Sequence, residues 1–425
     1  MRGGNSPICR VAVTGLGAVT PLGNTVEAFW DNLCAGRSGI GPITLFDASG
    51  FRTRIAAEVR DWAPPAAIGE RGARRMDRFA LFGLSAALEA WQDSCLSGKG
   101  DPLRLPVDRY EVGVVVGSSH GGEGTLLAEV GHVLRGDARK ISARLIPRML
   151  SNMAAAQIAI HLGLHGPNFS LGSACATGGH AIGEAAEIIR RGDAKVMLCG
   201  GTDAAITPLT LAGDQAVSAL SVRNEAPEQA SRPFDAARDG FVLGEGAAVL
   251  VLEEWEHAQE RKAHIYAELS GYAATADAVH ETRPDPSGVP AARGITRALE
   301  KAGISAGEID GIFAHATGTP LGDPAEAEAL RLALGESLSG ISVTAIKSAL
   351  GHLLAAAGAV QAVAVAKALQ TQQLPPTLNL ESPDPACALT FVTGTTQPTI
   401  LRHVLSNSFG FGGHNASLIF SSPSR

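Results

Sequence analysis

An apolar run gives way to a helical pattern within Leu171-Gly172-Ser173-Ala174-Cys175-Ala176-Thr177-Gly178-Gly179-His180. Apolar and small residues then recur at helical spacing, which predicts a helix over residues 176–190 that begins beside Cys175. The unpaired N–H groups and the positive dipole at a helix N-terminus favour a thiolate, so we expect a lowered pKa and a nucleophilic sulfur at Cys175. The segment is equally compatible with a buried structural cysteine.

Three later segments carry side chains that could act beside this sulfur. They are the strand-like run Ile312-Phe313-Ala314-His315, the turn Ile346-Lys347-Ser348-Ala349-Leu350-Gly351-His352-Leu353, and the loop Asn407-Ser408-Phe409-Gly410-Phe411-Gly412-Gly413-His414-Asn415. Glycines in the last segment allow the backbone to approach a reacting group closely. Taken singly, each histidine also fits an ordinary core or surface position, Lys347 fits a solvated charge, and the loop fits a tight hairpin.

Strand-like and helical patterns alternate along the chain. Apolar runs at 112–116, 196–199 and 247–252 are separated by helical patterns, which indicates an α/β protein whose sheet is covered on both faces. At 425 residues with 45% hydrophobic side chains, the chain can bury large cores. Gly15-Leu16-Gly17 lacks the third glycine of a dinucleotide-binding turn, and no internal repeat is visible in the letters.

Cysteine spacing, net charge and apolar stretches indicate which binding partners and which cellular compartment to expect. The six cysteines have neither paired nor metal-ligand spacing, so we expect no metal site and a reduced cytoplasmic setting. The net charge of −7 argues against nucleic acid as a partner. We expect no membrane association, because no signal peptide is recognised before Arg10 and the longest apolar stretch, 353–366, is interrupted by Gln361.

Together, the segments around Cys175, His315, Lys347 and residues 407–415 resemble, in order and spacing, the β-ketoacyl-acyl-carrier-protein synthases, most closely the type II condensing enzymes. Further matching segments extend the resemblance over nearly the whole chain: 10–17, 75–79, 231–235 and 239–246. The resemblance implies the thiolase fold, with two similar halves stacked as α-β-α-β-α. We expect residues 1–265 to form the half with the nucleophile and residues 266–425 the half with the two histidines.

The resemblance also implies a role for each matched residue. Cys175 would hold an acyl group as a thioester, and His315 and His352 would stabilise the enolate that a malonyl unit forms on decarboxylation. The backbone N–H groups of Cys175 and Phe411 would bind the oxyanion of the next intermediate. The remaining implied positions are Lys347 as an orienting charge with Glu326 as its partner, Phe409 as a supporting residue, and Thr317, Thr319 and Thr282 as contacts of the pantetheine arm.

The implied partner is an acyl carrier protein, which is itself acidic and needs a basic landing site. Arg71, Arg74, Arg75 and Arg78 are spaced three and four apart, which predicts one basic helical face, although a merely solvated face fits the same spacing. Arg139 and Lys140 match a second basic spot. The resemblance implies no resident cofactor, because the carrier brings its own phosphopantetheine arm, and it implies a homodimer or a heterodimer with a homologous subunit.

Departures from the family pattern concern the acyl pocket. His120 in Gly117-Ser118-Ser119-His120-Gly121-Gly122 stands where long-chain enzymes tend to have an apolar side chain. Arg144 and Leu145 occupy a pocket stretch near the dimer interface that is often aromatic. A polar group in such a pocket is costly unless it is paired, so we expect a polar, unsaturated or shorter acyl chain.

Three functions remain open on these grounds. The leading one is a β-ketoacyl-ACP synthase that performs the decarboxylative Claisen condensation of fatty-acid synthesis. The second is the ketosynthase subunit of a type II polyketide synthase, paired with a chain-length factor. The third is the noncatalytic chain-length subunit, although such subunits typically lack the cysteine that this chain retains. A degradative thiolase is disfavoured because the closing loop lacks a second cysteine.

Overall fold

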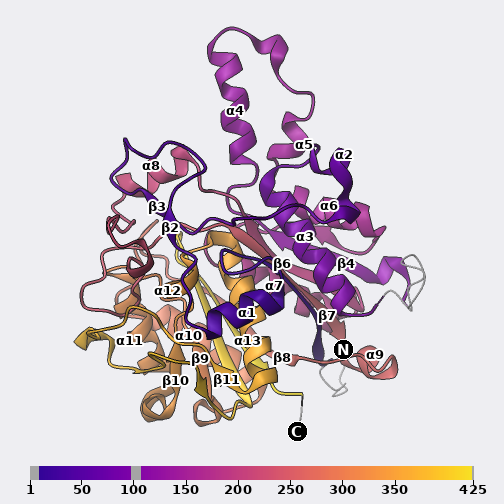
Figure 1. Cartoon of the computed structure of the whole chain (residues 1–425). Coiled ribbons are helices and arrows are strands. Elements are labelled where there is room, and N and C mark those ends of the chain that lie inside the picture. The colour runs from indigo at the N-terminus through magenta and orange to yellow at the C-terminus, as the bar shows by residue number, and fades with distance from the viewer. Residues whose placement is uncertain (1–8, 97–106, 424–425) are drawn as a thin grey trace.

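The computed structural model describes residues 9–96 and 107–423. Within them, eleven strands form one hydrogen-bonded sheet that folds into two layers, with helices on the faces of both (Figure 1). Its strands are β1 (Val11–Val19), β4 (Val112–Gly117), β5 (Asn168–Phe169), β6 (Val196–Asp203), β7 (Gly246–Glu254), β8 (Ala267–Ala276), β9 (Gly311–Phe313), β10 (Ser342–Thr344), β12 (Thr390–Phe391), β14 (His403–Gly410) and β15 (His414–Ser421). The α-helices are α1 (Val26–Cys34), α2 (Gly69–Ala73), α3 (Arg78–Asp93), α4 (Glu123–Leu134), α5 (Leu145–Met149), α6 (Met153–Leu162), α7 (Thr177–Arg191), α8 (Pro208–Ala216), α9 (Trp255–Glu260), α10 (Val289–Ala302), α11 (Gly322–Leu334), α12 (Lys347–Leu350) and α13 (Ala357–Thr371). Two small antiparallel pairs stand apart: β2 (Gly41–Pro42) with β3 (Ile55–Ala56), and β11 (Gln373–Leu374) with β13 (Gln397–Pro398).

The strand order repeats within the sheet. One set runs β1-β7-β6-β4-β5 and the other runs β8-β15-β14-β9-β10. When the five strands of each set are numbered along the chain, both sets have the spatial order 1-5-4-2-3. In each set the first two pairings are antiparallel and the last two are parallel. One set precedes residue 265 and the other follows it. The duplication that the letters do not reveal is therefore present in the topology.

Helices complete the predicted five layers. Helices α3 and α6 pack on the outside of the first set of strands, and α10 packs on the outside of the second with α11 against it. Helices α7 and α13 lie between the two sets and contact both. The arrangement confirms the α-β-α-β-α fold, and residue pairs between β1 and β8 join its two sheet layers along one edge.

The local patterns account for these elements. All nine residues of β1 are buried, as expected for a strand covered on both faces. The runs predicted at 112–116, 196–199 and 247–252 lie in β4, β6 and β7, and the helix predicted over 176–190 is α7. Gly178 lets α7 approach the central layer closely, because a Cβ there would lie 2.7 Å from the amide nitrogen of Ala359.

The apolar stretch before residue 372 is longer than the sequence indicated. Residues Leu354–Thr371 form one helical stretch, η7 (Leu354–Ala356) followed by α13, which has the length and composition of a membrane span. The protein interior buries 83% of it. Its apolar character is thus explained by its place between two sheets, where Gln361 donates hydrogen bonds to Phe313 and Asn407.

Helix α4 projects from the body, with α5 beside it (Figure 1). Several of its large apolar side chains are exposed, including Val130, Val133 and Leu134, of which Leu134 is 81% exposed. Clustered apolar exposure of this kind is typical of a surface that another chain covers.

Candidate active site

The turn before α7 presents Cys175. Ala174 has a left-handed backbone with φ of +47°, and the Thr177 hydroxyl accepts a hydrogen bond of 2.8 Å from the amide of Ser173. The β14–β15 turn closes on this backbone, because a Cβ at Gly410 would lie 2.5 Å from the carbonyl oxygen of Ser173 and 3.2 Å from the amide nitrogen of Cys175. A glycine at this position is therefore required for the close approach.

The predicted lowering of the Cys175 pKa is wrong. Burial raises the pKa of the Cys175 thiol to about 12, and the charge of Asp214 adds to the rise, whereas Lys347 and a hydrogen bond from the Phe411 N–H lower it. Cys175 also lies two residues before the first residue of α7, outside the helix itself. The resting sulfur is therefore a thiol at neutral pH, because loss of solvation outweighs the favourable charges.

His315 lies two residues beyond β9 in a loop that is fixed from both sides. The Glu326 carboxylate accepts hydrogen bonds of 2.8 and 2.7 Å from the amides of His315 and Ala316, and the Lys347 ammonium donates a 2.5 Å hydrogen bond to the His315 carbonyl. Burial and the Lys347 charge hold the pKa of His315 well below its usual value. The ring is therefore neutral at pH 7 and donates through a single N–H.

His352 approaches His315 from another turn. Its amide donates a 2.7 Å hydrogen bond to the Val242 carbonyl, and its ring lies edge to face against the rings of His315 and Phe241, with centroids 5.6 and 5.2 Å apart. Burial and the Lys347 charge lower the pKa of His352 well below its usual value. Both ring nitrogens are buried without a hydrogen-bond partner among the described residues. Such a ring is arranged to bind something that enters the cavity.

Lys347 and Glu326 act on each other through their charges, since Lys347 opposes the rise in the pKa of Glu326 and Glu326 opposes the fall in the pKa of Lys347. No ion-pair contact within 4.0 Å is found between these two described residues. They act instead on the same short segment, since Lys347 holds the carbonyl of His315 while Glu326 holds the amides of His315 and Ala316. Burial lowers the pKa of Lys347 and raises that of Glu326. Both side chains thus position the His315 backbone.

The glycine-rich loop forms the hairpin turn between β14 and β15. Phe409 packs against the His315 ring with centroids 5.6 Å apart, and Gly412 and Gly413 have φ of +88° and +74°. Phe411 is 39% exposed at the turn. The hairpin thus places one aromatic ring beside the histidine and the next at the edge of the cavity.

A cavity of about 640 Å³ gathers the predicted residues. Its lining includes Cys175, His315, His352, Glu326, Phe409, Phe411, Thr282, Thr317, Thr319 and His120. The hydroxyls of Thr317 and Thr319 lie 3.3 Å apart, and Thr282 lies in a separate loop whose backbone is held by His280. Segments that are far apart in the sequence thus converge on one space large enough for a small ligand.

Two predicted pocket residues lie elsewhere. Arg144 and Leu145 are at the start of α5, beside the projecting α4, and do not line the cavity of the single chain. The sequence missed Asp214, which reaches the cavity from α8. A single carboxylate in a helical sequence pattern does not indicate a pocket residue. Only the packing of α8 against the cavity shows that Asp214 lines it.

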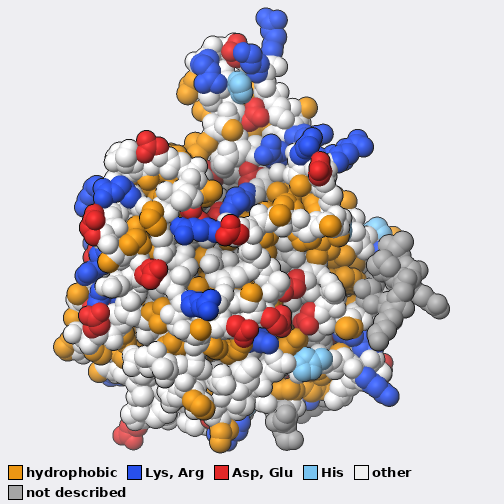
Figure 2. Space-filling model, viewed as in Figure 1, with side chains coloured by type: hydrophobic (Ala, Val, Ile, Leu, Met, Phe, Trp, Pro, Cys, Tyr) orange, Lys and Arg blue, Asp and Glu red, His pale blue; other side chains and the backbone are white. Residues whose placement is uncertain are grey.

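The predicted basic surface is divided. Helix α2 ends at Ala73 and α3 begins at Arg78, so the four arginines do not share one helical face. Arg78 forms an ion pair with buried Glu245 and lies over the ring of Phe82, which removes it from a docking surface. The residues that stay exposed are Arg71, Arg74 and Arg75 around α2 and Arg139 and Lys140 near the tip of the projection, where Figure 2 shows basic side chains gathered.

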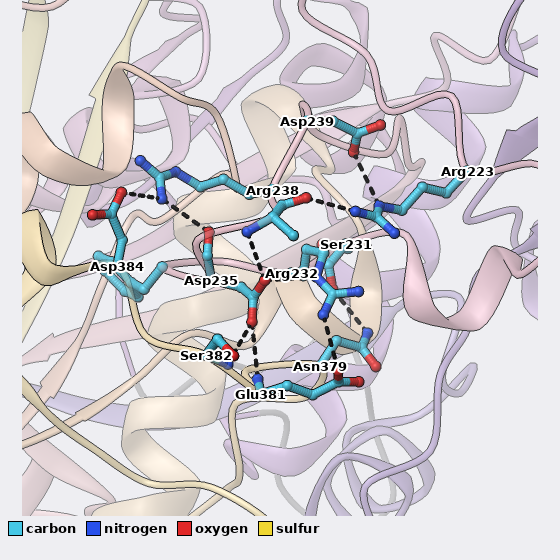
Figure 3. A network of polar contacts seen from close by, with 12 residues as sticks. Arg223, Ser231, Arg232, Asp235, Arg238, Asp239, Asn379, Glu381, Ser382 and Asp384 are labelled. Atoms are coloured by element: carbon cyan, nitrogen blue, oxygen red, sulfur yellow. Dashed lines mark hydrogen bonds and ion pairs between the residues drawn. The ribbon is translucent and has the colours of Figure 1, made fainter.

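A polar network surrounds Asp235 and Arg238 (Figure 3), and Arg238 links it to the loop that carries Thr317 and Thr319. Asp235 accepts hydrogen bonds from the Arg232 side chain and from the amides of Glu381 and Ser382. Arg238 binds Asp384 at 2.7 Å and donates a 2.9 Å hydrogen bond to the Thr319 carbonyl. Arg238 also donates a 2.9 Å hydrogen bond to the Asp235 carbonyl, so the Ser231–Asp235 segment singled out in the sequence is joined to the loop of Thr319.

The fold and this cavity define a ketosynthase-type acyltransferase of the thiolase fold. The chain belongs to the β-ketoacyl synthase family: residues 9–258 match the model of the N-terminal domain of β-ketoacyl synthases and residues 266–381 match that of the C-terminal domain. It is 46% identical over 411 residues to 3-oxoacyl-[acyl-carrier-protein] synthase 2 of Synechocystis sp., and the alignment covers 97% of both chains. It is also 46% identical to the protein of the same name from Coxiella burnetii, over 97% of this chain and 98% of that one.

Solved structures show the same similarity. A type II polyketide acyl-carrier protein in complex with its ketosynthase bound to the hexaketide includes a chain with a TM-score of 0.90 and 32% identity, over 97% of this chain and 99% of that one. The ishigamide ketosynthase/chain length factor matches with a TM-score of 0.89 and 34% identity, over the same shares.

Proposed function

We propose that this chain condenses a Cys175-bound acyl group with malonyl-acyl-carrier protein in fatty-acid synthesis. The observation that carries the proposal is the pair of neutral imidazoles of His315 and His352, which lie edge to face in the cavity that Cys175 also lines. The curated relatives at 46% identity are named for this reaction.

The first half-reaction loads the enzyme. The Cys175 sulfur attacks the carrier thioester, the new bond forms between this sulfur and the acyl carbon, and the bond from that carbon to the pantetheine sulfur breaks. The thiol proton of Cys175 passes to the departing pantetheine sulfur, which fits a nucleophile that is protonated at rest. The amides of Cys175 and Phe411 would bind the oxyanion of the intermediate.

The second half-reaction forms the carbon–carbon bond. The malonyl carboxylate leaves as carbon dioxide, and its electron pair becomes an enolate whose oxygen accepts hydrogen bonds from neutral His315 and His352. The enolate carbon attacks the acyl carbon on Cys175, and the sulfur leaves as a thiolate that then takes up a proton. Lys347 and Glu326 act as positioning residues, because they hold the backbone of His315 rather than the reacting atoms.

The carrier supplies the only prosthetic group in this scheme. We propose that its phosphopantetheine arm lies along Thr317, Thr319 and Thr282, whose hydroxyls suit its amides. Arg71, Arg74, Arg75, Arg139 and Lys140 form the proposed basic landing site for the acidic carrier. A homologous subunit or second copy would cover the apolar side chains of the α4 projection.

A ketosynthase subunit of a polyketide system is the second candidate function. The polar side chains of His120 and Asp214 in the cavity favour it over a pocket built only for saturated chains. Retention of Cys175 with both histidines argues against the noncatalytic chain-length subunit.

Acyl loading tests the proposed function directly. Intact-protein mass spectrometry of the protein incubated with an acyl-carrier-protein thioester should show one acyl group on the native chain and none on Cys175→Ala. Cys199→Ala is the matched control, since Cys199 is buried in β6 and does not line the cavity. An acyl group retained at full level by Cys175→Ala would refute the nucleophile.

A further inference from the structure

One part of the cavity is polar where a saturated acyl chain would need an apolar wall. His120 follows β4, and Asp214 comes from α8. Both line the cavity together with Ser119 and Ser218, and Cys175 lines the same space. The polar wall therefore faces the chamber in which the thioester would form.

One carboxylate oxygen of Asp214 lacks a hydrogen-bond donor. Its Oδ2 is buried and has no partner among the residues that the structure describes. Burial raises the pKa of Asp214 to about 6, Glu123 adds to the rise, and the His120 charge opposes it. The same carboxylate raises the pKa of Cys175, which places its charge near the sulfur. A buried carboxyl oxygen with no donor is costly, and a ligand that supplies one removes the cost.

His120 is oriented by a second carboxylate. Asp203 accepts a 3.2 Å hydrogen bond from the His120 amide and lies 3.7 Å from Nδ1 of the ring. Asp203 is itself held by the Ser118 hydroxyl and the Ala355 amide, so it is a fixed anchor. Burial lowers the pKa of His120, but Asp203, Glu123 and Asp214 together raise it above its usual value. With Nδ1 directed to Asp203, Nε2 is the ring atom left to a ligand.

We propose that Asp214 and His120 select an acyl group that carries a hydroxyl close to its thioester. The inference rests on the proposed function, because it takes Cys175 as the point of attachment. A hydroxyl satisfies both residues at once, since it donates to the Asp214 carboxylate and accepts from the His120 ring. A saturated chain of equal length offers no donor to Asp214 and no acceptor to His120, so it loads more slowly.

Self-acylation with two matched probes tests the selection. The full-length protein is incubated with the N-acetylcysteamine thioesters of 3-hydroxyhexanoic and hexanoic acid, and acyl-Cys175 is followed by mass spectrometry. We expect the hydroxylated probe to load about tenfold faster. Asp214→Leu should abolish or reverse this ratio, and Asp214→Asn, which keeps a hydrogen-bonding side chain, should retain part of it. Asp193→Leu, on the exposed surface, should leave the ratio unchanged.

The outcomes separate this inference from the proposed function. Equal loading of the two probes by the native protein, or an unchanged ratio in Asp214→Leu, would overturn the selection while leaving Cys175 as the nucleophile. Loss of the native oligomer in Asp214→Leu would also overturn it, because the carboxylate would then pair with a partner chain. Failure of both probes to load a folded native protein would refute the proposed function itself.

Discussion

The rings of His315 and His352 meet edge to face with an interplanar angle of 86°, although they come from separate turns. His352 is buried and His315 is half-buried, and desolvation together with the Lys347 charge lowers the pKa of both rings, so each stays neutral at pH 7. Two neutral imidazoles offer two N–H donors to one oxygen without the repulsion that two imidazolium ions would suffer. This relationship explains why the site suits an enolate.

Removal of one imidazole should separate the two half-reactions. His352→Ala is expected to lower condensation by about 10²–10⁴-fold, because the enolate loses a donor, while acyl loading of Cys175 persists. Product formation and acyl loading are measured on the same sample. His264→Ala, in a histidine outside the cavity, serves as the control. Parallel loss of both half-reactions in a folded variant would contradict the division of roles.

The reactivity of Cys175 should rise steeply with pH. Because burial raises the thiol pKa to about 12, the thiolate fraction grows about tenfold for each pH unit from 7 to 9. The rate of iodoacetamide labelling at Cys175, read by peptide mass spectrometry, should follow this slope. A plateau below pH 8 would instead show the lowered pKa expected from a helix N-terminus.

Glu326 should stabilise the protein through the amides of His315 and Ala316. Glu326→Gln places an NH₂ group against one of these donors, which should cost about 1–3 kcal/mol in the free energy of unfolding. Denaturant titration measures the change. Glu328→Gln on the same helix α11 is the control, since its partner Arg331 is exposed and the change should stay within about 0.5 kcal/mol. Equal effects of the two substitutions would contradict the assignment.

Gly410 should tolerate no side chain. The added Cβ of Gly410→Ala would clash with the Ser173 carbonyl, so the turn that carries Cys175 must shift, at a cost of about 1–3 kcal/mol and with loss of condensation. Thermal unfolding and turnover measure both effects. Gly50→Ala adds a Cβ in open space and should change neither. Normal turnover of Gly410→Ala would show that the approach of the two loops is not required.

We expect Arg78 to stabilise the fold, and Arg74 and Arg75 to bind the carrier protein. Arg78→Ala leaves the Glu245 carboxylate buried without its partner and should destabilise the protein by about 1.5–3 kcal/mol. The double substitution Arg74→Glu and Arg75→Glu should leave stability nearly unchanged and raise the KM for carrier-bound substrate several-fold. Denaturant titration measures the change in stability, and steady-state kinetics measures the change in KM. An unchanged KM would reject the docking role.

Much of the fold and of the site could be predicted from local patterns. Continuous apolar runs identified β4, β6 and β7, and helical spacing identified α7. The resemblance brought Cys175, His315 and His352 into one site, since the motifs that carry them are distinctive in order and spacing.

What escaped prediction depends on residues that are distant in the sequence. The raised pKa of Cys175 comes from burial by segments far along the chain, and Arg78 is withdrawn from the surface by Glu245. Asp214 enters the cavity only through the packing of α8. The duplicated strand order is a property of pairing, so it leaves no trace in the letters.

Release of carbon dioxide from malonyl-acyl-carrier protein by Cys175→Ala tests the central claim most directly, since the sulfur takes no part in breaking that bond. The account predicts that the variant still releases carbon dioxide while forming no condensed product, and that the additional substitution His352→Ala stops the release. Absence of release from a folded Cys175→Ala protein, or undiminished release after His352→Ala, would contradict the assignment of decarboxylation to the two imidazoles.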